Sequence, residues 1–173
     1  NGDVQLGTMP DPTKLGLLGK NFHLHETGSV IGDGTLFLNA TDDPMNWYIY
    51  QSPQLNNLTV QKSVDVLGDS SHYDVTVNGT YRHEDGTVNL GPHDLKIENT
   101  GSFTRLAGTY QATTGYLIQR STAFDQGVGG GNFEIPNFRI SVMNPFVANN
   151  AANADSFKVT KRIDLANGGY NQF

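Results

Sequence analysis

The first residues that could do chemistry lie in a short alternating segment. Phe22, Leu24 and Glu26 share one face of an expected strand, and His23 and His25 share the other. If the two apolar side chains point into a core, the Glu26 carboxyl group points inward with them. A carboxyl group in apolar surroundings has a raised pKa, which suits a general acid or a proton shuttle. The alternative is a solvated Glu26 at the mouth of the fold, without a chemical role.

The pair His23-x-His25 places two imidazoles on one face, as half of a metal site would. Two ligands are too few, and His72, His83 and His93 do not have a spacing that completes a set. We therefore expect surface histidines and no metal site.

Two further positions combine a structural and a chemical interpretation. Asp42 and Asp43 precede Pro44 at the end of an expected strand, where they either start a turn or place a carboxylate at the mouth of the fold. Tyr81 lies on the apolar face of its strand. It belongs in the core with its hydroxyl group on a partner, or it lines a pocket.

An aromatic cluster follows Pro44. Trp47, Tyr48 and Tyr50 stand close together beside amide side chains, an arrangement that could stack on a sugar or form an interface. An ordinary strand of packed aromatic side chains is the simpler alternative.

Several function classes are excluded. The 173 residues contain no cysteine, and the net charge of −6 argues against a broad nucleic-acid surface. No window approaches the roughly 18 apolar residues of a membrane span. Motifs for a serine nucleophile, a phosphate loop or a dinucleotide are absent, so we expect no cofactor.

The elements that must position these residues are strands. Short runs alternate with a period of two between turn residues, and the clearest of them covers residues 157–165. Eight or nine such runs follow one another closely, which favours antiparallel pairing and closure into a barrel. We expect one barrel domain over residues 20–166, with extended segments at 1–19 and 167–173. No internal repeat of the solenoid kind is apparent.

Part of this sequence resembles a known family. Residues 22–26 read Phe-His-Leu-His-Glu, the next run ends in Asp42-Asp43-Pro44, and Asn99-Thr100-Gly101-Ser102-Phe103 precedes Ala107-Gly108. Over residues 20–118 this pattern is similar to the plant dirigent proteins and the related allene oxide cyclase barrels. The sequence has Glu26 in place of the family's Asp, and Thr104 and Ala107 stand where the family has Arg.

The resemblance implies an all-β fold, a single antiparallel β-barrel of about eight strands. It also implies that a small apolar or phenolic molecule binds inside and that its cyclisation or coupling is steered there. Glu26, Asp42, Asp43 and Tyr81 would be the catalytic residues.

Three sequons, at Asn39, Asn57 and Asn78, predict a secreted glycoprotein. Two other functions remain open. One is a non-enzymatic extracellular structural subunit, a homo-oligomer that assembles through ordered tails or strand addition. The other is a carbohydrate-binding module that uses Trp47 and Tyr48.

Overall fold

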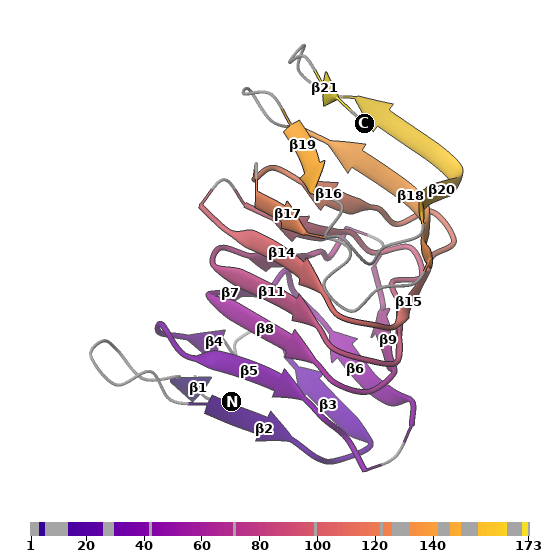
Figure 1. Cartoon of the computed structure of the whole chain (residues 1–173). Helices are drawn as coiled ribbons and strands as arrows, with labels where there is room; N and C mark the ends of the chain where they lie inside the picture. Colours follow the sequence, from indigo (N-terminus) through magenta and orange to yellow (C-terminus); the bar gives the residue numbers. More distant parts are fainter. Residues whose placement is uncertain are drawn as a thin grey trace.

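The computed structural model describes most of the chain. The described residues are 4–5, 14–25, 30–41, 43–70, 72–98, 100–121, 123–125, 132–141, 146–149, 156–165 and 171–172. All regular elements among them are strands, so the all-β prediction is confirmed (Figure 1). Within these ranges, no helix has the length and apolarity needed to cross a bilayer.

The strands form three long sheets and one short one. The six-stranded sheet has the order β20 (Ser156–Leu165), β18 (Asn132–Ile140), β16 (Leu117–Gln119), β13 (Leu95–Ile97), β10 (Val75–Val77) and β7 (Gln54–Leu55). The eight-stranded sheet has the order β2 (Lys14–Leu17), β5 (Thr35–Leu38), β8 (Asn57–Val60), β11 (Thr80–His83), β14 (Ser102–Arg105), β17 (Ala123–Asp125), β19 (Phe146–Asn149) and β21 (Asn171–Gln172). The five-stranded sheet has the order β15 (Thr109–Gln111), β12 (Thr87–Asn89), β9 (Val64–Gly68), β6 (Met45–Ile49) and β3 (Asn21–Leu24), and β1 (Val4–Gln5) pairs with β4 (Val30–Ile31).

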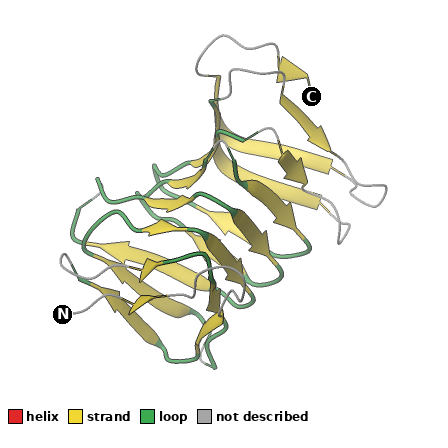
Figure 2. Ribbon diagram, turned by 90° about the vertical axis from the view of Figure 1, so that its left-hand side faces the viewer, coloured by secondary structure: helices red, strands yellow, loops and turns green. Residues whose placement is uncertain are grey.

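From β5 to β16 the chain visits the three long sheets in turn and repeats the circuit, and from β16 to β21 it alternates between the six-stranded and eight-stranded sheets. Thus β10, β11 and β12 are followed by β13, β14 and β15, each parallel to its counterpart one coil earlier. The result is a β-solenoid of about five turns, with coils stacked along one axis (Figures 1 and 2).

The predicted antiparallel barrel is therefore wrong. Alternation with a period of two reports that one face of a strand is buried, and it does so equally for parallel and antiparallel neighbours. Parallel neighbours need a long connection between them. In this chain the connection between two parallel neighbours consists of the strands that the same coil adds to the other two sheets. The strands therefore follow one another closely in the sequence.

The expectation of no internal repeat is wrong as well. In the eight-stranded sheet Leu36, Leu58, Tyr81 and Phe103 are register partners, spaced by 22, 23 and 22 residues. These four inward-facing residues share burial but not identity, and the spacing varies by one. The repeat is therefore a repeat of polarity, which a search for similar residues does not find.

The interior of the solenoid is filled by side chains. Leu36, Ile49, Val77 and Ile97, drawn from all three long sheets, each expose less than 1% of their surface. The apolar cavity between Trp47 and Tyr81 has a volume of only about 10 Å³. That is about the space of one water molecule, so this cavity cannot hold the small ligand that the resemblance implied.

Side chains at the corners connect one coil to the next. The Ser52 hydroxyl oxygen accepts a hydrogen bond from the Asp74 backbone N–H at 3.1 Å. The carboxylates of Asp74 and Asp94 in turn accept from the backbone N–H groups of Asp94 and Tyr116, at 2.9 and 2.8 Å. These bonds satisfy backbone donors at the bends, where the sheet ladder is interrupted.

The first half of β18, which we call the cap, packs beside β15 at the end of the five-stranded sheet and is covered in turn by β20. It carries the Phe133 ring, which is fully buried, to 5.9 Å from Phe103 and 5.5 Å from Tyr110. The pairing of β18 with β20 shifts register between Ile135 and Asn137. The residue between them is Pro136, which has no N–H group to donate to a ladder.

Candidate functional site

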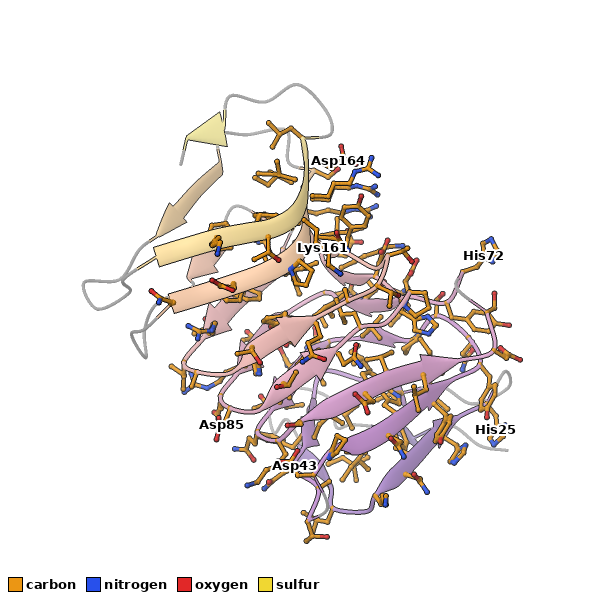
Figure 3. The ribbon with its side chains drawn as sticks, turned by 90° about the vertical axis from the view of Figure 1, so that its right-hand side faces the viewer. His25, Asp43, His72, Asp85, Lys161 and Asp164 are labelled. Atoms are coloured by element: carbon orange, nitrogen blue, oxygen red, sulfur yellow. The ribbon has the colours of Figure 1, made fainter. Side chains whose placement is uncertain are left out.

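Of the four predicted catalytic residues, the structure describes Asp43 and Tyr81. Glu26 and Asp42 lie outside the described residues. Asp43 is exposed at a corner, where its carboxylate accepts from the Ser63 backbone N–H at 3.1 Å. Tyr81 is completely buried in the eight-stranded sheet, as the core interpretation predicted. Figure 3 shows that Asp43 and His25 lie at opposite margins of the five-stranded sheet.

Tyr81 belongs to a buried polar cluster. The Tyr110 hydroxyl group donates to the Tyr81 hydroxyl oxygen at 2.7 Å, and both residues are buried. Burial raises the pKa of both phenols, so neither ionises near neutral pH. The pair is sealed from solvent and serves packing rather than substrate chemistry.

His83 lies next to this pair, facing inward. Its Nε2 atom lies 3.0 Å from the Asp85 carbonyl oxygen, so Nε2 carries the proton and donates. Nδ1 is buried and has no hydrogen-bond partner within the described part of the chain. Burial, with a smaller contribution from the Arg105 guanidinium, lowers the pKa of His83 to about 4. The ring is therefore neutral at pH 7.

Arg105 completes the cluster and ties it to the cap. Its Nε and Nη2 atoms donate to the Gly108 carbonyl oxygen at 3.1 and 3.0 Å, and Nη2 also donates to the Asn132 carbonyl oxygen at 3.3 Å. The guanidinium carbon lies 4.9 Å from the centroid of the Phe133 ring. Burial lowers the pKa of Arg105, and the bonds to carbonyl oxygens compensate for the lost hydration.

The outer surface offers a different kind of site. A groove of about 410 Å³ follows the outer face of the six-stranded sheet, where its strands bend toward the eight-stranded sheet. All of the side chains that line it are polar: Gln54, Thr76, Asn78, Lys96, Glu98, Thr100 and Arg120. Thr76 lies between Gln54 and Lys96 in register.

Two ion pairs hold the charged side chains of the groove. Lys96 Nζ lies 2.7 Å from an oxygen of Asp74, and Arg120 Nη1 lies 2.8 Å from an oxygen of Glu98. Partly exposed pairs of this kind contribute at most about 1 kcal/mol each to stability. Their effect is to fix the orientation of N–H donors at the surface. Glu98 is the one carboxylate among the described residues that line the groove.

The aromatic cluster does not form a sugar platform. Trp47 exposes 1% of its surface and packs against Phe22, with ring centroids 6.1 Å apart. Outside the sheet, His23 stacks on Tyr48 at 4.4 Å and His25 stacks on Tyr50 at 5.1 Å, both with nearly parallel planes. These rings cover one another's faces. Among the described residues, no group of three metal-ligating side chains gathers.

The three sequons lie in different surroundings. The Asn57 amide is engaged, since Oδ1 accepts from the Thr80 N–H at 2.8 Å and Nδ2 donates to the Asp33 carbonyl oxygen at 3.0 Å. Asn39 is half-buried, and Asn78 is exposed at the edge of the groove. Glycosylation stays a prediction, and Asn78 has the most accessible acceptor of the three.

Sequence reasoning missed the groove. Its residues are spread over 54–120, and no single motif contains more than one of them. The pairs Thr76/Asn78 and Lys96/Glu98 mark the same outer face in two successive coils, so the missing signal was the coil period. Comparisons with protein-family models, with curated proteins and with solved structures gave no match.

Proposed function

We propose that this protein is a non-catalytic carbohydrate-binding solenoid, and that the groove of the six-stranded sheet is its binding surface. One observation carries the proposal. The groove is a shallow, open depression of about 410 Å³ whose lining consists of amide, hydroxyl and charged side chains on or beside the strands. Polar groups held at fixed positions in this way can set the orientation of a hydroxyl-rich ligand.

The donors and acceptors of the groove match a hydroxyl-rich ligand. Gln54 and Asn78 each offer both a donor and an acceptor, as a sugar hydroxyl group does. Most enzymes that hydrolyse glycosides use two carboxyl groups that flank the bond. Glu98 alone, already paired with Arg120, does not supply this arrangement. Binding without cleavage is therefore the function that the geometry supports.

The test is a binding panel. The purified chain is run in native gels that contain neutral or acidic polysaccharides, and its retardation is compared with that of Lys96→Met and Arg120→Met. We expect retardation by at least one polysaccharide, weakened in both variants. Arg82→Met is the matched control, because Arg82 also forms a surface ion pair, with Glu84, but lies outside the groove. Absence of retardation by every polysaccharide would contradict the proposal.

The alternative of a structural subunit is favoured by a separate observation. Ile163 and Leu165 expose 48% and 54% of their surface on β20, the last strand of the six-stranded sheet. A sheet edge with exposed apolar side chains can pair with another chain, although the charged residues of β20 oppose this. Sedimentation at increasing concentration would show association of the wild-type chain and its loss in Ile163→Thr/Leu165→Thr. A wild-type monomer at all concentrations would contradict this alternative.

A further inference from the structure

We infer that the groove binds a neutral glycan in extended form, with the sugar chain parallel to the solenoid axis. This inference rests on the proposed function and adds to it the charge, the direction and the length of the ligand. Each of the three follows from a different feature of the groove.

The direction follows from the coils that contribute to the lining. Gln54 comes from β7, Thr76 from β10 and Lys96 from β13, and Arg120 follows β16. A ligand lying along one strand would meet the side chains of one coil only. A ligand lying along the axis meets a new row of polar side chains in every coil, so a chain of several units makes polar contacts at each step.

The length follows from the spacing of the rows. Neighbouring strands are about 4.8 Å apart, so four coils extend over about 14 Å. One pyranose unit of an extended chain advances by about the width of one coil. The groove therefore accommodates roughly three sugar units.

The charge follows from the pairing of the ionic side chains. The charge of Lys96 is balanced by Asp74 and that of Arg120 by Glu98. The lining residues together with Asp74 therefore carry no net charge. The whole chain has a net charge of −6 at pH 7, which repels a polyanion. The remaining N–H groups of Lys96 and Arg120 are then donors to neutral hydroxyl groups.

The experiment is isothermal titration calorimetry of the full chain with cello-, xylo- and manno-oligosaccharides of one to six units. In at least one series we expect affinity to rise with each unit up to about three, and then to change by less than about twofold. Raising the salt concentration from about 50 to about 500 mM should change the affinity by less than about twofold, because no net charge is neutralised.

Variants at the two ends of the groove test the direction. Gln54→Ala and Arg120→Met should each weaken binding of the trisaccharide, Arg120→Met by about tenfold. The control Arg82→Met should leave it unchanged. Exclusive binding of acidic oligosaccharides with a steep dependence on salt, or a monosaccharide that binds as tightly as the trisaccharide, would overturn the inference while the proposed function stands. Absence of binding to any carbohydrate would overturn both.

Discussion

Tyr81 shows how little a residue's type says about its role before its neighbours are known. On the sequence it is a phenol that could line a pocket. In the structure its oxygen accepts from Tyr110, and neither ring reaches solvent. Removing one partner of a buried hydrogen bond leaves the other unsatisfied, whereas removing both does not. The two hydroxyl groups should therefore be strongly coupled in their effect on stability.

That coupling can be measured with a double-mutant cycle. We expect Tyr110→Phe and Tyr81→Phe each to lower the free energy of unfolding by about 1–3 kcal/mol. The double variant should lose less than the sum of the two. Urea unfolding monitored by circular dichroism gives the three values. Additive losses would show that the hydroxyl groups do not act as a pair.

His83 gives the solenoid a pH dependence of defined sign. The pKa of the folded form is about 4, below the ordinary value of 6.5. As the pH falls through 6.5 the unfolded chain takes up a proton that the folded chain refuses, so stability is lost until the pH reaches about 4. The groups facing the ring are the Asp85 carbonyl oxygen, Arg105, Tyr81 and Tyr110.

We expect this residue to remove on the order of 3 kcal/mol of stability between pH 7 and pH 4. In His83→Phe the free energy of unfolding should fall less steeply over that range. The difference between the two profiles isolates the histidine from the carboxylates, which titrate in both proteins. Parallel profiles would mean that His83 accepts a proton while the chain is folded.

At the scale of elements, the strand β18 is tied to the coil beneath it by Arg105. The guanidinium joins the Gly108 and Asn132 carbonyl oxygens and lies over the Phe133 ring.

We expect Arg105→Met to lower the free energy of unfolding by about 3 kcal/mol. Hydrogen exchange should accelerate in β18 before it does in β6, which lies farther from the cap. Arg82→Met, whose side chain is on the outer face, should cost less than about 1 kcal/mol. Unchanged exchange in β18 would show that Arg105 does not hold the cap.

The sequence was informative about elements and uninformative about their pairing. Alternation correctly placed Tyr81 on the buried face of its strand and His23 and His25 on the exposed face of theirs. Pairing depends on which strand lies beside which, and for that only the coil period is informative. His83 and Arg105 conceal this period, because they occupy the inward position that Val60 fills one coil before His83 and two coils before Arg105.

The same limit applies to the candidate site. A catalytic motif is a short stretch of sequence. The expected residues Glu26, Asp42 and Asp43 were chosen because each lies in such a stretch. The groove is assembled from one to three residues per coil, and it exists only once four coils are stacked. The types of Lys96 and Arg120 were visible in the sequence, but their common surface was not.

At the scale of the whole molecule, a stack of coils is held together by nearest neighbours. Each coil packs on the coil before it and the coil after it. Its stability is therefore the sum of its intrinsic free energy and the free energies of its two interfaces. A defect in the middle should therefore spread over few coils. Ile97 is suited to the test because it is fully buried and lies between Val77 and Gln119 in register.

Truncating this side chain in Ile97→Ala should cost about 2–5 kcal/mol through lost burial and the cavity left behind. In native-state hydrogen exchange, protection should fall first in β10, β13 and β16. The strands β6 and β3, three and four coils away from β15, should keep theirs. Leu24→Ala, in the first strand of the five-stranded sheet, is the matched control and should affect β3 and β6 instead. An equal loss of protection in all strands would mean that the solenoid unfolds as a single cooperative unit. The groove would then open only with the whole molecule, whereas nearest-neighbour behaviour lets the coils that form it loosen on their own.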